Sequence, residues 1–494
     1  MDNVILAFQE VIQLQTILAI IGGNIFGLIV GCIPGLTITV GMVFMLPATF
    51  LMPTQVAISL LLGMYVSGMT AGSISAILLN MPGTPSASAT GIDGHEMAKK
   101  GEAGRALGSA IFGSFFGGLI SFTALIFISP LIANIALRFG AVELFSLLLL
   151  GLALISSFGR GSGKAINKAI IATIIGLILT TVGYDMQTGI PRFTFDVSRL
   201  NQGFHILPVM IGLFALPPII DGVGKETKDK YSKMYKSGVT ASLPTLEDIK
   251  KFPKYIAMSG VVGTIVGAIP GAGGPIAVFL SYDYSKKIAP KDRKKLFGTG
   301  IPEAIAAPEA ANNAISGGAL IPAFTLGIPG DPITAVLLGA LMLQGLTPGP
   351  MLFDQNPVLI YGSFISLFIA NFTNVAVILL VMKGLIQVLR VPTKYMLTVI
   401  SGFCVIGSFA LRNNPMDIFS MIGCGILAYF MNKFDYPIIP LLLAVVLGGP
   451  MEEHLRMALR LNPGNPYVFF TSPISLGFLL LAGLTFVVPI VTGE

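Results

Sequence analysis

The sequence predicts an all-α, polytopic transmembrane protein, and three observations carry that prediction. Only 11% of the 494 residues are charged, against about 25% in soluble domains. The apolar fraction is 54% and the mean hydropathy is +0.83, so a soluble fold would lack polar residues to cover its surface. The chain also holds 58 Gly and 32 Pro, which membrane helices tolerate where neighbouring helices satisfy the freed backbone groups. Composition therefore excludes a soluble globular protein, a disordered chain and a disulfide scaffold.

Apolar segments of about 20 residues can cross a bilayer, and about twelve such spans can be counted. Their cores are, in chain order, Leu14–Ile33, Ala57–Leu79, Leu107–Leu137, Val142–Ser157, Ile166–Tyr184, Ile206–Ile220, Ile256–Ile269, Val358–Val381, Met396–Leu411, Ile418–Met431, Ile438–Leu447 and Ile474–Val491. Shorter apolar pieces lie between them and are expected to be half-helices or re-entrant segments: Thr37–Leu51, Gly273–Tyr282, Ala304–Leu326 and Pro332–Leu346.

Basic loops predict the orientation of these spans, because Lys and Arg collect on the cytoplasmic side of a membrane. Four clusters, at Lys99–Arg105, Arg160–Lys168, Gly224–Lys254 and Lys286–Lys295, should therefore be cytoplasmic. They also account for the net charge of +6 without invoking nucleic acid. The segment Met1–Gln15 contains no Lys or Arg, so we expect an external N-terminus and no cleaved signal peptide.

The chain contains an internal repeat. Gly27–Gly35 aligns with Gly263–Gly271 at an offset of 263 − 27 = 236, with seven of nine positions identical. Leu79–Pro85 matches Leu326–Pro332 at an offset of 329 − 82 = 247. Two collinear matches with similar offsets indicate two related halves. We divide the chain into a first membrane repeat with its following spans at 1–223, a cytoplasmic basic loop at 224–255, and a second repeat with its following spans at 256–494.

Charge indicates that the two repeats are inverted. After the first shared motif, one half reaches the uncharged Leu51–Gln55 and the other reaches the basic Lys286–Lys295. After the second motif the bias reverses, because Lys99–Arg105 corresponds to Gly345–Met351, which has no basic residue. Matching loops of opposite bias should lie on opposite sides, as in the inverted repeats of secondary transporters. A parallel repeat whose loop charges have drifted is the alternative.

A Pro-Gly-x-Pro run interrupts each half. Proline removes a backbone donor and glycine opens positive φ, so each run should end a helix at membrane depth. Non-helical backbone survives there only when it is buried in protein or lines a wet cavity, where amides can hold an anion and carbonyls a cation. An interfacial turn is the alternative interpretation. The predicted substrate-binding residues are Asn80, Pro82, Gly83, Thr84, Pro85 and Ser86 in the first run and Pro329, Gly330, Asp331 and Pro332 in the second.

The Gly-x-Ile-Pro-Gly motif of each half supplies a second pair of breaks. Each motif ends an apolar helix with small residues four apart, such as Gly27 with Gly31 and Gly263 with Gly267, which permit close helix packing. Packing and substrate binding are both open for this pair. Its candidate substrate-binding residues are Pro34, Gly35 and Thr37 in the first half and Pro270, Gly271 and Gly273 in the second.

The segment Pro302–Ser316 places acidic and amide side chains among small residues. Glu309, Asn312 and Asn313 lie three and four apart, so one helical face is expected to present them together as ion-coupling residues. The alternative is a loop leading out of the preceding basic cluster, since Pro302 and Pro308 should prevent one continuous helix at its start. No metal spacing, nucleotide motif or catalytic motif is present, so we expect no enzyme, metal centre or cofactor; Na⁺ and H⁺ are the candidate coupling ions.

These motifs together resemble those of a known family, the large membrane subunit of tripartite tricarboxylate transporters. The resemblance covers nearly the whole chain and rests on the two Gly-x-Ile-Pro-Gly motifs, Asn80–Pro85, Asp93–Gly94 ahead of Gly101, Ala307–Ala314, Gly327–Pro332 and Gly449–Arg456. It implies a cation-coupled importer of di- or tricarboxylates in the bacterial inner membrane. It also implies two partners, a small four-span membrane subunit and a periplasmic solute-binding protein that delivers the ligand.

The function expected from the sequence is therefore that of a secondary transporter with its site between the broken repeats. A passive channel or structural membrane scaffold is the alternative. A channel needs a continuous polar pathway, whereas this chain shows isolated polar breaks near the ends of apolar helices. Dependence of uptake on an ion gradient separates the two hypotheses.

Overall fold

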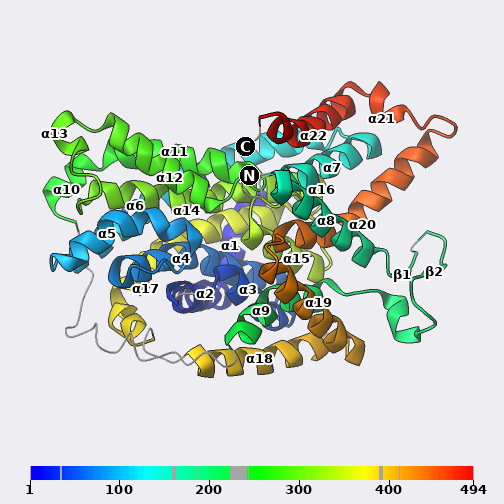
Figure 1. Ribbon diagram of the computed structural model, residues 1–494, viewed down its shortest axis with the longest axis horizontal. Helices are drawn as coiled ribbons and strands as arrows, with labels where there is room; N and C mark the ends of the chain where they lie inside the picture. Colours follow the sequence, from blue (N-terminus) through cyan, green and yellow to red (C-terminus); the bar gives the residue numbers. More distant parts are fainter. Residues whose placement is uncertain are drawn as a thin grey trace.

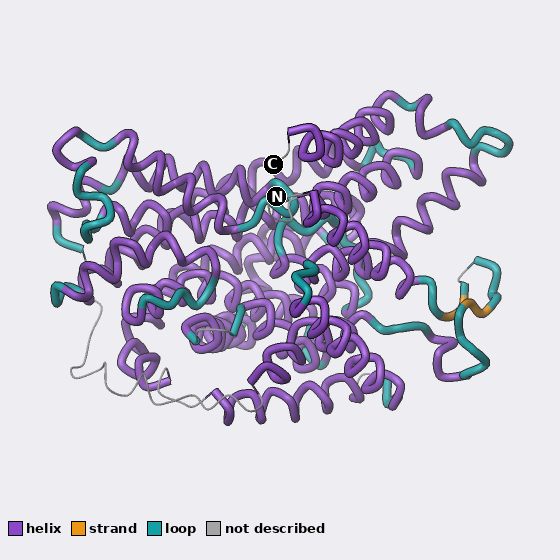
Figure 2. The backbone as a smooth tube through the Cα atoms, viewed as in Figure 1, coloured by secondary structure: helices purple, strands orange, loops and turns teal. Residues whose placement is uncertain are grey.

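The computed structural model describes residues 2–33, 36–157, 163–185, 187–222, 242, 244–388, 393–410 and 412–492. Within those ranges the chain forms α-helices, two short 3₁₀ helices and one antiparallel ribbon of two strands, seen in orange at one end of the molecule in Figure 2. The predicted boundary loop at 224–255 lies largely outside the described residues, as do Pro34 and Gly35.

The first half of the chain contains α1 (Asp2–Val11), α2 (Leu14–Cys32), α3 (Ile38–Phe50), α4 (Thr54–Leu79), η1 (Pro85–Ala87), α5 (Ser88–Lys99), α6 (Ala103–Ala136), α7 (Ala141–Ser157), α8 (Gly163–Thr180), β1 (Gly183–Tyr184), β2 (Pro191–Arg192), η2 (Ser198–Gln202) and α9 (Ile206–Gly222). The second half contains α10 (Leu246–Lys251), α11 (Pro253–Ala268), α12 (Gly274–Ile288), α13 (Lys291–Lys294), α14 (Glu303–Leu326), α15 (Pro332–Leu343), α16 (Pro350–Gln355), α17 (Pro357–Val388), α18 (Thr393–Ala410), α19 (Pro415–Lys433), α20 (Ile438–Leu461), α21 (Val468–Thr471) and α22 (Pro473–Thr492).

The all-α, multi-span prediction is confirmed. Five described helices, α2, α4, α6, α17 and α20, are long and apolar enough to cross a membrane, and six further apolar helices are shorter. Each of the twelve predicted span cores overlaps one helix. Three of the four predicted shorter pieces are the short helices α3, α12 and α15.

The fourth of these pieces, Ala304–Leu326, is not a half-helix. It forms most of α14, a continuous helix of 24 residues. Pro302 precedes its first turn, where a missing N–H costs nothing, and Pro308 is accommodated inside it. Nearly every side chain of α14 is buried, principally against α6 and α11. This packing outweighs the proline defect, so the predicted interruption of the helix is wrong.

The sequence repeat is also a repeat of structure. Asn80 and Gly327, which end α4 and α14, both have left-handed backbone with φ of 54° and 70°, and they are separated by 327 − 80 = 247 residues. Thr84 and Asp331 precede η1 and α15 and are again separated by 331 − 84 = 247 residues. A left-handed residue followed by a turn therefore ends the equivalent helix in each half, α4 in the first and α14 in the second.

Contacts between α4 and α14 show how these two equivalent helices run relative to each other, which is antiparallel, as inverted halves require. Asn312 of α14 donates to the carbonyl of Met69 in α4, whereas Glu309, one turn earlier, interacts with Ser73. The contact positions rise along one helix as they fall along the other, so the two helices are antiparallel. In Figure 1 the labels of α4 and α14 stand in the left half of the view, and those of α7, α20 and α22 in the right half.

The small-residue pairs predicted to pack helices closely do so. A Cβ on Gly27 would lie 2.6 Å from the carbonyl oxygen of Met64 in α4, and one on Gly31 would lie 2.7 Å from that of Gly68. In the second half, a Cβ on Gly263 would lie 2.3 Å from the carbonyl oxygen of Ala311 in α14. Glycine is thus required where α2 meets α4 and where α11 meets α14.

Candidate functional site

The first Pro-Gly-x-Pro run is a re-entrant turn. Asn80 reverses the chain at the end of α4, and the N–H of Gly83 then donates to the carbonyl of Gly72 at 3.2 Å. Gly72 lies seven residues before the end of α4, so the chain returns about 10 Å along that helix before η1 begins. The hydroxyls of Thr84 and Ser86 are buried there, 3.3 Å apart.

The second run makes the corresponding turn after α14. Gly327 reverses the chain, and the N–H of Gly271 donates to the carbonyl of Gly330 at 3.1 Å, which ties the two breaks of this half together. Asp331 then caps α15 through a reciprocal pair of hydrogen bonds with Thr334. The other carboxylate oxygen of Asp331 accepts from the Tyr65 hydroxyl of α4 at 2.5 Å.

Gly83 and Gly330 are needed for close approach, not for a left-handed backbone. Neither is among the described residues with positive φ, which at these turns are Asn80 and Gly327. A Cβ on Gly83 would lie 2.1 Å from the carbonyl oxygen of Gly31, and one on Gly330 would lie 2.6 Å from that of Gly267. The predicted positive φ at these two glycines is therefore wrong, and steric crowding is what excludes a side chain.

We expect Gly83→Ala to destabilise the folded protein by about 1–3 kcal/mol, because the added methyl group overlaps backbone that cannot move freely. Gly91→Ala is the matched control, since a Cβ at Gly91 meets nothing closer than 3.7 Å. The measurement is the midpoint of thermal unfolding of both variants in detergent. Equal midpoints would show that the first turn is loosely packed.

Six of the predicted substrate-binding residues line one small cavity of about 110 Å³. Gly271 and Gly273 come from the first break of the second half, and Pro329, Gly330, Asp331 and Pro332 come from its second break. The opposite wall belongs to the start of α20, which no sequence motif indicated: it consists of Pro437, Ile439, Pro440 and Leu443.

The remaining predicted residues lie around the other breaks. The Thr37 side chain caps α3 by accepting from the N–H of Val40. The turn at Ser86 meets the start of α12, since a Cβ on Gly274 would lie 2.7 Å from the Ser86 Cβ. Asn80 and Pro82 lie on the exposed side of the first turn. The start of α12 has no side-chain cap, whereas the first N–H of α5, at Ser88, donates to the carbonyl of Pro85 in η1.

Glu309 is completely buried in the interior of α14. It accepts a hydrogen bond of 2.5 Å from the Thr90 hydroxyl of α5. The Asn312 amide donates to the carbonyl of Met69 at 2.9 Å and lies 3.5 Å from the second carboxylate oxygen. The Oδ1 atom of Asn312 is buried and has no hydrogen-bond partner. The alternative that this segment is a surface loop is excluded.

Asn313 does not share that face of α14. Its amide donates to the carbonyl of Ser114 in α6 at 2.9 Å and to Oδ1 of Asn371 in α17 at 3.3 Å. The expectation that one helical face presents all three predicted residues therefore holds for Glu309 and Asn312 only.

Three further residues were missed by the sequence interpretation. Tyr65 contacts Asp331, while Thr90 and Ser73 contact Glu309. The repeat offset contained a signal for Tyr65, because 312 − 65 = 247 places it at the position equivalent to Asn312. Thr90 and Ser73 are single hydroxyls in apolar helices and carry no comparable signal.

Asp93 anchors the helix that carries Thr90. Its buried carboxylate accepts from the Tyr282 hydroxyl at 2.7 Å and from the N–H groups of Gly298, Gly300 and Ile301 at 2.7–3.2 Å. Four donors from one loop and α12 thus fix the position of α5 relative to α14. Asp93 is a positioning residue for the Glu309 cluster.

Glu309 and Asp331 have no basic partner in the described part of the chain, where the ion pairs involve other carboxylates. Glu303, for example, pairs with Arg293. A buried carboxylate without a counter-charge is costly, and such groups inside membrane proteins are usually functional. The arrangement is suited to taking up a cation beside each carboxylate.

Comparison with known proteins identifies the relatives of this chain. The family model of the tripartite tricarboxylate transporter TctA family matches residues 17–443. An uncharacterized 52.8 kDa protein in the TAR-I ttuC' 3' region of Agrobacterium vitis is 35% identical over 487 residues, which are 99% of this chain and 95% of that protein. An uncharacterized protein in the TAR-II ttuC' 3' region of the same organism is 38% identical over 217 residues, 44% of this chain and 89% of that protein. No solved structure matches. The chain belongs to the tripartite tricarboxylate transporter TctA family.

Proposed function

We propose that this membrane component imports di- or tricarboxylates across the bacterial inner membrane, driven by a gradient of Na⁺ or H⁺. A periplasmic solute-binding protein delivers the carboxylate, and a small four-span membrane subunit completes the assembly. The observation that supports this most is the pair of inverted re-entrant turns beside two buried carboxylates without counter-charges. The function builds on the family to which the chain belongs.

The donors available for the carboxylate are backbone amides and hydroxyls. An unpaired anion cannot be buried without partners, and the cavity beside Asp331 contains no Lys or Arg. The uncapped start of α12 lies beside Ser86 at Gly274, and the positive end of a helix dipole favours anions. Thr84 and Ser86 add hydroxyl donors at the same place.

Coupling to an ion follows from the negative charge of both the site and the substrate. A carboxylate substrate entering beside Asp331 meets a like charge, so transport requires a cation to bind with it. Glu309 and Asn312 supply carboxylate and amide oxygens for that cation, and these are ligands suited to hard cations. Binding of the ion then strengthens binding of the substrate, and binding of the substrate strengthens binding of the ion by the same factor.

The test of this function is uptake by the assembled transporter in proteoliposomes. With the partner subunits and the binding protein present, a carboxylate should accumulate above its external concentration only when an inward Na⁺ or H⁺ gradient is imposed. If the carboxylate instead equilibrates across the membrane at the same rate with and without an ion gradient, the protein is a passive channel.

The orientation carries its own prediction. Pro53→Cys should react with an impermeant thiol reagent only from outside, and Lys291→Cys only from the cytoplasm, because the loop charges have opposite bias. The background replaces Cys32, Cys404 and Cys424, which are buried and free. The measurement is labelling of intact cells against inverted vesicles. Labelling of both new cysteines from one side would contradict the proposed orientation of the two halves.

A further inference from the structure

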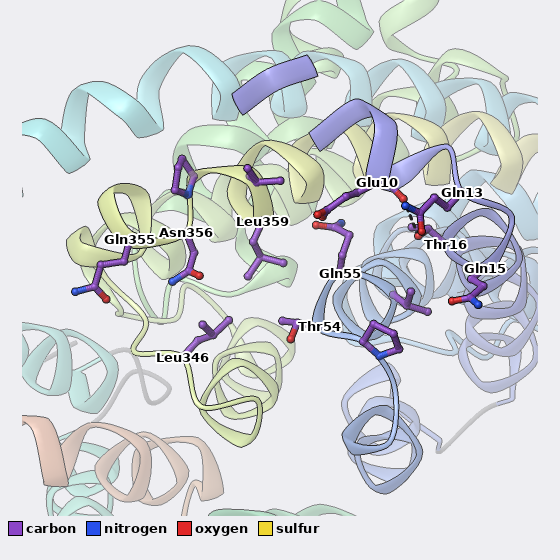
Figure 3. A pocket seen from close by; sticks show the side chains of 14 residues that line it. Glu10, Gln13, Gln15, Thr16, Thr54, Gln55, Leu346, Gln355, Asn356 and Leu359 are labelled. Carbon is purple, nitrogen blue, oxygen red and sulfur yellow. Dashed lines mark hydrogen bonds between the residues drawn. The ribbon is translucent and has the colours of Figure 1, made fainter. Parts of the chain in front are cut away.

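A larger cavity lies away from the two turns, where α1 ends and α2, α4 and α17 begin. Its volume is about 510 Å³, and its lining is rich in amide side chains, with Gln55 at the start of α4. Glu10 is the one charged residue among the lining residues. Figure 3 shows the side chains of Glu10 and Gln55 directed toward each other across this cavity. Such an opening attracts a cation and repels a free carboxylate.

A line of buried polar side chains continues inward from this cavity between α4 and α17. Gln55 donates to Ser59 at 3.0 Å, and Ser59 lies 2.8 Å from the hydroxyl of Ser366. One turn further along α17, Asn24 of α2 donates to the carbonyl of Ala370 and to the hydroxyl of Thr373. We call this line the α4–α17 seam; its residues are Gln55, Ser59, Ser366, Asn24, Thr373, Asn374 and Thr70.

The seam ends at the Glu309 cluster. Asn374 donates to the Thr70 hydroxyl at 3.1 Å, and the next residue back, Met69, accepts from Asn312. Asn312 in turn lies beside Glu309. From Gln55 to Thr70 the seam follows fifteen residues of α4, which is about 23 Å, most of the ~30 Å thickness of a bilayer's hydrocarbon core.

Unpartnered oxygens mark the whole seam and its end. Among the described residues, the buried side-chain amide oxygens that lack a hydrogen-bond partner are those of Gln55, Asn24, Asn374 and Asn312. All four residues are more than nine-tenths buried. A buried acceptor without a donor costs free energy. Because four such oxygens lie along the seam and at its end, we expect a bound cation to satisfy them.

We propose that the α4–α17 seam is the route by which Na⁺ passes from the Glu10 cavity to Glu309, with the amide oxygens of Asn24 and Asn374 as intermediate ligands. Amide and hydroxyl oxygens suit a hard cation, and a chain of carbonyl-type oxygens allows several weak binding sites in series. The inference rests on the proposed function and adds the identity of the ion, its entry point and two ligands that the repeat motifs do not contain.

The test measures Na⁺ binding to the purified full-length chain. Stabilisation by Na⁺, with choline at equal ionic strength as reference, is followed by the reaction of a thiol-specific dye with Cys32, Cys404 and Cys424 as they are exposed on unfolding. Asn374→Ala should raise the half-saturating Na⁺ concentration about tenfold, the effect of losing one strong oxygen partner. Ser363→Ala is the control, because the Ser363 hydroxyl, also buried in α17, bonds only to its own helix, and it should leave that concentration unchanged.

A second variant tests the Glu10 cavity as the entrance, because Gln55 lies at the start of α4. Gln55→Met keeps the side-chain length but removes the amide, and it should slow the initial uptake of ²²Na⁺ by the assembled transporter about tenfold. An unchanged Na⁺ midpoint in Asn374→Ala, or an unchanged ²²Na⁺ rate in Gln55→Met, overturns the inference. Uptake driven by protons without any Na⁺ stabilisation also overturns it and leaves the proposed carboxylate import standing. Uptake that needs no ion gradient contradicts the proposed function itself.

Discussion

Glu309→Gln should lower ion-driven uptake about 100-fold, whereas the ion dependence of Glu303→Gln should remain normal. The substitution keeps the size of the side chain and can still accept from Thr90, but it removes the negative charge that holds the cation in the interior of α14. A charge-assisted interaction of about 3 kcal/mol corresponds to that factor. The measurement is the initial uptake rate as a function of ion concentration, normalised to transporter in the membrane.

Glu303 is the matched control because it lies in the first turn of the same helix. Its buried carboxylate is neutralised by Arg293, so Glu303→Gln should reduce the amount of folded protein without changing the ion concentration for half-maximal uptake. Normal ion dependence in Glu309→Gln would remove Glu309 from the coupling site.

Asp331→Asn should also lower uptake strongly, by about 100-fold, while the protein folds. An asparagine at this position keeps the oxygen that caps α15 through Thr334 and loses only the charge beside the small cavity. Tyr65→Phe should be milder, because it removes one hydrogen bond to the carboxylate, worth about 1–3 kcal/mol when a buried group is left unpaired.

The two variants are compared by uptake at saturating ion concentration and by the yield of folded transporter. The order expected is wild type, then Tyr65→Phe, then Asp331→Asn. Full uptake in Asp331→Asn would show that its carboxylate serves only as a helix cap, and the substrate site would then lie elsewhere.

The backbone turns were predictable from the sequence because their cause is local. A Pro-Gly-x-Pro run interrupts a helix, whereas the single Gly449-Pro450 pair lies inside α20. The repeat of the run indicated that Asn80–Pro85 and Gly327–Pro332 would make the same turn. The roles of the individual residues were less accessible. Gly83 and Gly330 looked like positive-φ positions, but their crowding against Gly31 and Gly267 depends on which helices are neighbours.

The contacts of the site could not be predicted, because they join distant parts of the chain. Tyr65 and Asp331 are 266 residues apart, and Thr90 and Glu309 are 219 residues apart. The wall supplied by the start of α20 is apolar and follows no motif. At Pro308 the local rule failed, because it predicted a break in the helix, whereas the nearly complete burial of α14 keeps that helix continuous.

The central claim is that the re-entrant turns bind a carboxylate together with a cation, and protection of a single cysteine tests it most directly. Ser86→Cys, in a background without the three native cysteines, places a thiol where the first turn meets α12. A carboxylate that the transporter accumulates should slow alkylation of this thiol at least tenfold, and only when the coupling ion is present, because the two ligands bind cooperatively. If the thiol is alkylated at the same rate with and without saturating carboxylate and ion, while the variant still transports, the turns are not the binding site.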